Sequence, residues 1–171
     1  MRTILTKEQL DITIKRLANQ VLENIVNAED IVLIGIQPRG IFLSDRIMDD
    51  IKKEFPAEAE KIKYGKLDIT FYRDDVRDEL HTANQTDIAF SIENKTVILV
   101  DDVLYKGRTV RAALDALLTF GRPDKVELCV LIDRRFRREL PIQPDYCGKA
   151  IDSINSQKVK VEWDKEEVIL Y

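Results

Sequence analysis

The sequence predicts an α/β protein with a central, mostly parallel sheet flanked by helices. Two observations carry this prediction: aliphatic runs of strand length recur along the chain, and segments with a helical spacing of apolar residues lie between them. Parallel strands need a crossover long enough for a helix, and this alternation supplies it. A chain of 171 residues can bury one core, so residues 1–171 are expected to form a single domain.

The first half of the chain is expected to supply two helices and two strands. From residue 6 to about 27, apolar residues recur every three or four positions, which predicts a helix with Thr6 as its N-cap. The run "DIVLIGI" (30–36) predicts a buried strand, and "QPRG" turns the chain into a second helix that extends to about Lys53. The alternating "KLDITFY" (66–72) predicts another strand.

The second half continues the same alternation. The segment "TVILV" (96–100) predicts a buried strand, and "RAALDALLTF" (111–120) predicts a helix that Gly121 and Pro123 end. A further strand is expected at "KVELCVLI" (125–132). The tail "SQKVKVEWDKEEVILY" indicates two short strands separated by an acidic turn around residues 164–167.

One stretch does not fit this pattern. Residues 73–94 are too long and too polar for an ordinary connection, which leaves a mobile lid, a hairpin or simple disorder as alternatives. We favour a flexible loop that acts as a lid, or a long hairpin. His81, the only histidine, lies in this stretch, where a solvated loop residue is a better interpretation than a catalytic base.

Composition excludes several classes of protein. The net charge of −4 and the pI near 5.2 argue against a surface that binds nucleic acid everywhere, although a local basic patch is compatible with them. No apolar run approaches the roughly 18 residues of a membrane span, and the N-terminus has no signal-peptide core, so we expect a cytoplasmic protein. Cys129 and Cys147 lack metal-ligand spacing and are expected to be reduced.

The stretch "VILVDDVLYKGRT" (97–109) carries the chemistry. A buried strand leads into Asp101 and Asp102, and a short turn with Gly107 leads into a helix, whose N-terminus is a natural phosphate site. The pattern is neither a Walker A loop nor a Rossmann fingerprint. Paired carboxylates at a strand end can hold a metal, act as a base or accept hydrogen bonds from vicinal hydroxyls. The whole constellation indicates a phosphorylated sugar.

The same stretch closely resembles the thirteen-residue PRPP-binding motif of type I phosphoribosyltransferases. Further blocks, "GIQPRGIFLSDRI", "LDITFYRDD" and "RELPIQPDYCGK", resemble the PyrR family of pyrimidine regulatory proteins, which also act as uracil phosphoribosyltransferases. The resemblance covers nearly the whole chain in order. It implies a type I phosphoribosyltransferase fold with a hood, and conversion of uracil and PRPP to UMP and pyrophosphate.

The resemblance also implies roles for individual residues. Asp101 and Asp102 would bind the ribose hydroxyls of PRPP, and Mg²⁺ would bind with PRPP near them. Backbone groups near Asp133 and Arg134 would read the uracil edge. Catalysis would depend on Arg39, Arg73 and Asp102. The remaining PRPP contacts would come from the pyrophosphate loop and the phosphate turn, at Arg39, Gly40, Lys106, Gly107, Arg108 and Thr109.

Two departures from the family pattern stand out. Lys106 occupies the place of the threonine in the family's "YTGRT", and "DRRFRREL" replaces the usual "DRGHREL" with one additional residue. The second departure affects the segment where the uracil pocket is expected.

The family also binds a stem-loop in the leader mRNA of pyrimidine operons through a basic face of a dimer. The expected counterpart here is a positive cluster of Arg134, Arg135, Arg137, Arg138 and Lys149, with Lys15 and Arg16 added from the first helix. We expect a homodimer or homotetramer. Two alternatives stay open: an RNA-binding regulator with little catalysis, and a phosphoribosyltransferase for another nucleobase.

Overall fold

The computed structural model describes residues 1–74 and 85–171. Residues 75–84 of the expected flexible loop or hairpin at 73–94, His81 included, lie outside the described residues. Residues 85–94 are described, and Asp87 among them forms an isolated antiparallel bridge with Lys66. Within the described part of the chain, no helix is both long enough and apolar enough to cross a membrane.

A five-stranded parallel sheet forms the centre of the molecule. Its order is β3-β2-β4-β5-β6, and every neighbouring pair runs parallel, as the alternation of strands and helices predicts. β4 is the middle strand, with all of residues 97–102 buried. The bounds of the strands are β2 Ile31–Ile36, β3 Lys63–Leu67, β4 Thr96–Leu104, β5 Lys125–Arg135 and β6 Tyr146–Asp152.

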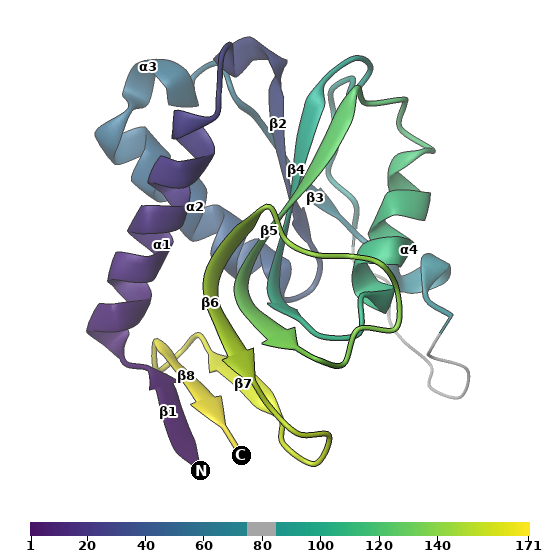
Figure 1. The fold of residues 1–171 in the computed structure, drawn as a ribbon. Coiled ribbons are helices and arrows are strands. Elements are labelled where there is room, and N and C mark those ends of the chain that lie inside the picture. The colour runs from purple at the N-terminus through teal and green to yellow at the C-terminus, as the bar shows by residue number, and fades with distance from the viewer. Residues whose placement is uncertain (75–84) are drawn as a thin grey trace.

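Helices cover both faces of this sheet (Figure 1). α1 (Lys7–Glu23) and α2 (Gly40–Glu54), followed by the short α3 (Pro56–Ala59), pack on one face, and α4 (Arg108–Leu117) packs on the other. Thr6 caps α1 as predicted, because its side chain accepts a hydrogen bond from the backbone of Gln9 while the Gln9 side chain accepts one from the Thr6 backbone. Short 3₁₀ turns lie at η1 (Ala28–Asp30) and η2 (Thr70–Tyr72).

A second, three-stranded sheet lies near the carboxyl ends of the parallel strands, at the foot of Figure 1. Its order is β1-β8-β7, with both pairs antiparallel. The two tail strands, β7 (Val159–Glu162) and β8 (Glu167–Leu170), and the turn between them were predicted from the sequence. The first strand, β1 (Arg2–Leu5), and the sheet edge strand β6 were not.

The strand predicted at residues 66–72 is wrong beyond Leu67, and the observed strand begins earlier, at Lys63. β3 ends at Leu67, and residues 70–72 turn as η2. The apparent alternation of apolar and polar residues continues to Phe71, but the side chain of Phe71 is 85% exposed rather than packed in the core. The predicted start of α4 is also late, because the helix begins at Arg108, directly after the turn.

Candidate functional site

Two adjacent carboxylates lie inside the middle strand of the sheet. Asp101 and Asp102 belong to β4 itself and are only 7% and 5% exposed. The backbone N–H of Asp102 donates a hydrogen bond of 2.9 Å to Oδ1 of Asp101. Charged side chains are rarely buried without partners, so the burial of this pair carries a desolvation cost.

Burial raises the pKa of the Asp101 carboxyl well above its ordinary value of 3.8, and the neighbouring charge of Asp102 raises it further. Three weaker effects oppose this rise: the hydrogen bond from the Asp102 backbone and the positive charges of Arg39 and Arg73. The structure therefore brings both arginines predicted for catalysis within electrostatic reach of the carboxylate pair.

Arg39 bridges the two sheets across this site. It stands at the N-cap of α2, where its Nε donates to Oδ2 of Asp102 at 2.8 Å and its Nη2 donates to the carbonyl oxygen of Val161 at 2.8 Å. Gly40, the next residue, allows α2 to approach β4 closely, because a Cβ at this position would lie 2.4 Å from the carbonyl oxygen of Val100. The glycine thus sets the distance between Arg39 and the carboxylates.

The phosphate turn, residues 105–109, joins β4 to α4. Gly107 is the N-cap of α4 and has a φ of +95°, in the left-handed region that favours glycine. The first amide groups of any α-helix have no partner within the helix and carry partial positive charge, so this turn presents donors suited to an anion. The expected strand, turn and helix start are all in place here.

Acidic side chains pair with the cations of this turn. Nζ of Lys106 and Nε of Arg108 lie 2.8 and 2.6 Å from the two carboxylate oxygens of Glu139. Asp74, the residue after Arg73, accepts from Nη1 of Arg108 and Nη2 of Arg111, both at 3.0 Å. The start of α4 is therefore tied to the segment after β5 and to the base of the long polar stretch.

The end of β5 is held by its own arginines. The side chain of Arg134 is buried, and its Nε and Nη2 donate to Oγ of Ser153 at 2.9 Å and to the carbonyl of Gln157 at 2.8 Å. Its guanidinium lies 3.9 Å from the ring centroid of Tyr105. Arg138 donates to Oδ1 of Asp133 and to the carbonyl of Tyr105. Asp133 lies opposite Leu104 of β4 and Ala150 of β6, so the residues predicted to read the base belong to the sheet itself.

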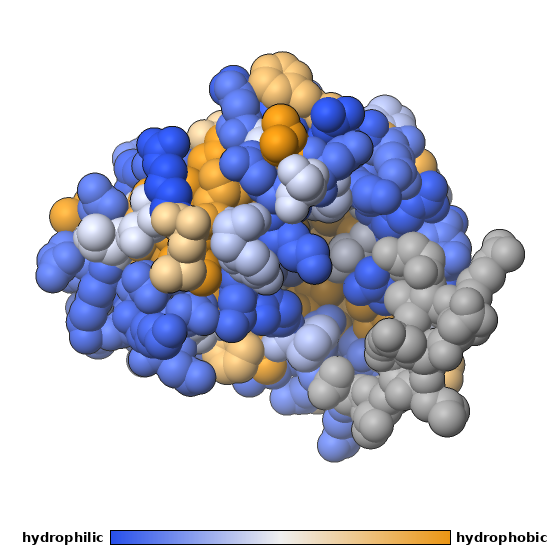
Figure 2. Space-filling model, turned by 90° about the horizontal axis from the view of Figure 1, so that it is seen from below, coloured by the Kyte–Doolittle hydropathy of each residue, from blue (hydrophilic) through white to orange (hydrophobic). Residues whose placement is uncertain are grey.

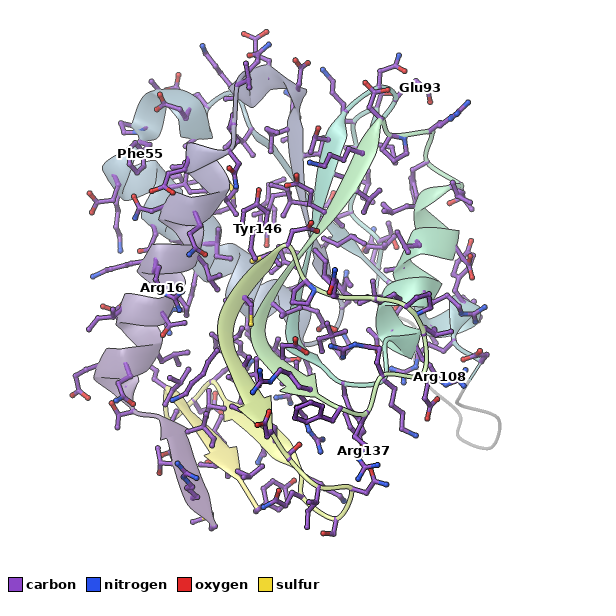
Figure 3. All side chains as sticks on the ribbon, in the orientation of Figure 1. Arg16, Phe55, Glu93, Arg108, Arg137 and Tyr146 are labelled. Carbon is purple, nitrogen blue, oxygen red and sulfur yellow. The ribbon has the colours of Figure 1, made fainter. Side chains whose placement is uncertain are left out.

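The residues predicted for RNA binding are spread over several elements. Arg16, on α1, donates to the carbonyl of Gly148, and Nζ of Lys149 donates to the carbonyl of Ile4 at 3.1 Å. Arg137 is exposed in the segment after β5, and Figure 3 shows it well away from Arg16. With Arg134 buried and Arg138 bonded to Asp133, the structure does not gather the predicted set into one patch.

Glu139, Asp74 and the Val161 carbonyl were missed by sequence reasoning. Glu139 and Asp74 stand inside the family-like blocks "RELPI" and "FYRDD", which is the only signal that could have found them. The Val161 carbonyl carries no side-chain signal, and it meets Arg39 only because the tail strands fold back onto the parallel sheet.

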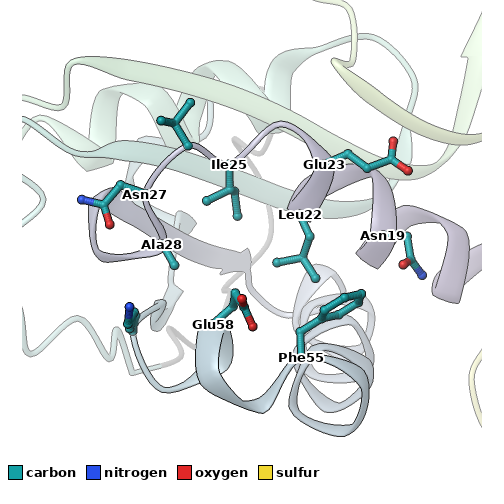
Figure 4. Close-up of a pocket in the computed structure, with 10 residues that line it drawn as sticks. Asn19, Leu22, Glu23, Ile25, Asn27, Ala28, Phe55 and Glu58 are labelled. Carbon is teal, nitrogen blue, oxygen red and sulfur yellow. The ribbon is translucent and has the colours of Figure 1, made fainter.

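The surface seen from below in Figure 2, at the end of the molecule toward which the parallel strands run in Figure 1, is mainly hydrophilic with apolar patches. A hollow of about 410 Å³ lies elsewhere, between the end of α1 and α3 (Figure 4). Leu22, Ile25 and Phe55 form its apolar floor, and Phe55 lies at the end of the molecule opposite Arg108 and Arg137 in Figure 3. This hollow contains neither the carboxylate pair nor the phosphate turn.

Comparison with known proteins agrees with this geometry. The model of the phosphoribosyl transferase domain family matches residues 2–166. A protein from Picosynechococcus sp. named Bifunctional protein PyrR is 45% identical over 92% of this chain and 88% of its own. Its namesake from Enterococcus faecalis is 45% identical over 94% of this chain and 92% of its own. A third, from Caldicellulosiruptor bescii, is 43% identical over 99% of this chain and 93% of its own.

Solved structures share the fold. A hypoxanthine phosphoribosyltransferase from Staphylococcus aureus superposes with a TM-score of 0.68 at 21% identity, over 89% of this chain and 78% of that one. A hypoxanthine-guanine phosphoribosyltransferase from Bacillus anthracis gives 0.67 at 22% identity, over 89% and 82%. The fold is that of the type I phosphoribosyltransferases. Its family match and its relatives extend over almost the whole chain, and the chain belongs to the phosphoribosyl transferase family and, within it, to the PyrR proteins.

Proposed function

We propose that this protein transfers the phosphoribosyl group of PRPP to N1 of uracil, which yields UMP and pyrophosphate. One observation carries the proposal: a buried pair of carboxylates in β4 is followed, five residues after Asp102, by a glycine turn that opens α4. A ribose 5-phosphate has a matching layout, with a diol at one end and a phosphate at the other.

The carboxylate pair would bind the diol. Asp102 presents Oδ2, which Arg39 contacts in the free chain, and the ribose hydroxyls are donors that can replace that contact. Asp101 has a raised pKa because it is buried beside Asp102, and hydrogen bonds from hydroxyl groups would favour its ionised form. The pair therefore gains partners on binding that it lacks in the free chain.

The phosphate turn would hold the 5-phosphate through Lys106, Gly107, Arg108 and Thr109. The backbone donors of a turn and helix start can approach an anion closely, and Gly107 permits the left-handed backbone conformation that this turn needs. Lys106 and Arg108 add charge, although both face Glu139 in the free chain. Holding both ends of the sugar phosphate fixes its anomeric carbon for attack.

Arg39, Gly40 and Arg73 would face the leaving pyrophosphate. Departure breaks the bond from the anomeric carbon to a pyrophosphate oxygen as the bond to uracil N1 forms, and the N1 proton is released to water. Negative charge therefore grows on the leaving group. Fixed guanidinium groups beside it stabilise that charge. No protein nucleophile is required, and Asp102 would support the positive charge that develops on the ribose ring. Backbone groups near Asp133 and Arg134 would orient the base.

Mg²⁺ fits this donor set as an ion that arrives with PRPP. Among the described residues, no cluster of three or more histidine, cysteine, aspartate or glutamate side chains could cage a metal. Asp101 and Asp102 offer carboxylate oxygens, and Mg²⁺ commonly takes one or two of these together with substrate oxygens and waters. When bound, Mg²⁺ would supply neutralising charge to the pyrophosphate.

A substrate panel tests the proposal. PRPP and Mg²⁺ are mixed with uracil, hypoxanthine, guanine, xanthine or orotate, and pyrophosphate release is measured. We expect release with uracil, and its loss in Arg39→Ala. Arg46→Ala is the matched control, because this arginine also lies on α2 but pairs with Asp11 and Glu166 instead of with the carboxylate pair. If another base is converted and uracil is not, that base is the substrate. Full activity in Arg39→Ala would overturn the site assignment.

Regulation through RNA is the second candidate function. The relatives are named bifunctional, and the exposed Arg137 stands in the segment that departs from the family pattern. Phosphate contacts make RNA binding salt-dependent, whereas recognition of one stem-loop needs specific base contacts. We expect binding to a pyrimidine-operon leader stem-loop that UMP strengthens and Arg137→Ala weakens. Equal affinity for an unrelated hairpin would contradict specific regulation.

A further inference from the structure

Glu139 makes three contacts with the phosphate turn. Its two carboxylate oxygens lie 2.8 Å from Nζ of Lys106 and 2.6 Å from Nε of Arg108. Its backbone N–H donates to the carbonyl of Lys106 at 3.0 Å. Each carboxylate oxygen thus contacts one cation. Two oxygens of a bound phosphate group would make the same pair of contacts.

The two cations are those proposed above to receive the 5-phosphate, so this inference rests on the proposed function. The hydrogen bond from Lys106, and then that from Arg108, lower the pKa of the Glu139 carboxyl below its ordinary value. Glu139 is therefore ionised near neutral pH, and a bound phosphate would lie against a like charge. The Glu139 side chain is 36% exposed, which leaves it room to turn toward water.

Lys106 makes this arrangement particular to the present chain. The family pattern has threonine at this position, which cannot form an ion pair with Glu139. Here the lysine adds positive charge to the turn, and Glu139 offsets it in the free chain. Asp74 partly offsets Arg108 in the same way, at 3.0 Å, although it also pairs with Arg111, so the two carboxylates reduce the positive charge of the turn.

We propose that Glu139 is an internal counter-ion of the phosphate turn, which competes with the sugar phosphate for Lys106 and Arg108 and turns to solvent when the phosphate binds. Release of the carboxylate leaves only the backbone contact between Glu139 and Lys106. Phosphate binding therefore removes both side-chain contacts of Glu139 from the segment after β5. That segment follows Asp133 and Arg134, which lie near the end of β5, where the nucleobase is expected. The sugar phosphate would prepare the base pocket before the base enters.

Ribose 5-phosphate is the probe for the first test, because it carries the phosphate and the diol without pyrophosphate. Its affinity is measured by isothermal titration calorimetry at low salt, for the parent chain and for Glu139→Gln. We expect the variant to bind roughly three- to tenfold more tightly, since one like charge near the ligand is removed. The matched control is Asp11→Asn, which removes a carboxylate that also bridges two cations, Lys15 at 3.0 Å and Arg46 at 3.2 Å.

A double-mutant cycle with Lys106→Thr sharpens the test. If Glu139 occupies Lys106 in the free chain, then Lys106→Thr weakens ribose 5-phosphate binding only slightly in the parent and severalfold more in the Glu139→Gln background. Equal losses in both backgrounds would contradict competition. Thermal unfolding of each variant confirms that it is folded at the temperature of the titration.

The ribose 5-phosphate titrations test the role of Glu139 separately from the proposed phosphoribosyl transfer. Weaker or unchanged binding in Glu139→Gln, with measurable binding in the parent chain, would overturn the counter-ion while leaving the proposed function intact. In that case Glu139 would serve as a brace that orients Lys106 and Arg108. Absence of ribose 5-phosphate binding in both chains would overturn the site and the counter-ion together.

Discussion

The two ends of the proposed sugar-phosphate site are built in opposite ways. At the diol end, Asp101 and Asp102 are buried within the middle strand, and their neighbours are fixed by the packing of α2 on β4. At the phosphate turn, Lys106 and Arg108 are 47% and 34% exposed and pair with other surface residues. A buried charge responds strongly to each neighbour, whereas solvent screens an exposed one. The diol end should tolerate little change, and the phosphate turn should tolerate much more.

The largest expected effect comes from Asp102→Asn. The change keeps the shape of the side chain but removes the charge that we propose supports the ribose, so kcat/KM for PRPP should fall by at least about 100-fold. Initial rates of pyrophosphate release measure it. Asp30→Asn is the control, because Asp30 is an exposed carboxylate that pairs with Lys95 at 3.1 Å. If kcat/KM falls by less than tenfold in Asp102→Asn, the diol end is no more sensitive to change than the phosphate turn.

Replacing one glycine at each end with alanine compares how much each end contributes to the free energy of unfolding. A Cβ on Gly40 would lie 2.4 Å from the Val100 carbonyl oxygen, so Gly40→Ala forces α2 from β4 and should cost about 3 kcal/mol. A Cβ on Gly107 has room, with its nearest neighbour at 3.4 Å, but φ is +95°, so Gly107→Ala should cost about 1 kcal/mol through the backbone alone. Urea denaturation measures both, and the reverse order would contradict this account.

The raised pKa of Asp101 predicts how stability depends on pH. The folded chain binds this proton more tightly than the unfolded chain, so ionisation of Asp101 costs stability. The cost appears as pH rises from the ordinary value of 3.8 and is complete above the folded pKa. Asp101→Asn removes it, and the variant should therefore gain stability over the parent as pH rises. Urea midpoints across a pH series measure this gain, and a constant difference would argue against a raised pKa.

The smallest effect is expected at the phosphate turn. Lys106→Thr restores the family's residue and removes a lysine whose charge Glu139 already offsets at 2.8 Å. The KM for PRPP should rise by less than about threefold, because exposed ion pairs contribute little. Steady-state kinetics at several PRPP concentrations measure it. A loss as large as that of Asp102→Asn would mean that the exposed end matters as much as the buried one.

Features formed by contiguous residues could be predicted from the sequence, whereas contacts between distant residues could not. The buried strand, the carboxylates and the glycine turn are contiguous, so local pattern and family resemblance identified them together. β6 escaped prediction because its burial is irregular, with Lys149 and Ala150 exposed in mid-strand. The contacts of Arg39 with Val161 and of Lys106 with Glu139 join distant parts of the chain, and no local pattern encodes such pairs. Three-dimensional packing supplies them.

The small antiparallel sheet also determines when the site can form during synthesis. β1 pairs with β8, so that Arg2 lies opposite Leu170, and β1 cannot pair until residues up to 170 have emerged from the ribosome. Arg39 has the same dependence, because its partner carbonyl at Val161 belongs to β7. The parallel sheet and its carboxylates can assemble earlier, from residues 31–152. A nascent chain would therefore carry its acidic pair before the arginine that spans the two sheets is anchored.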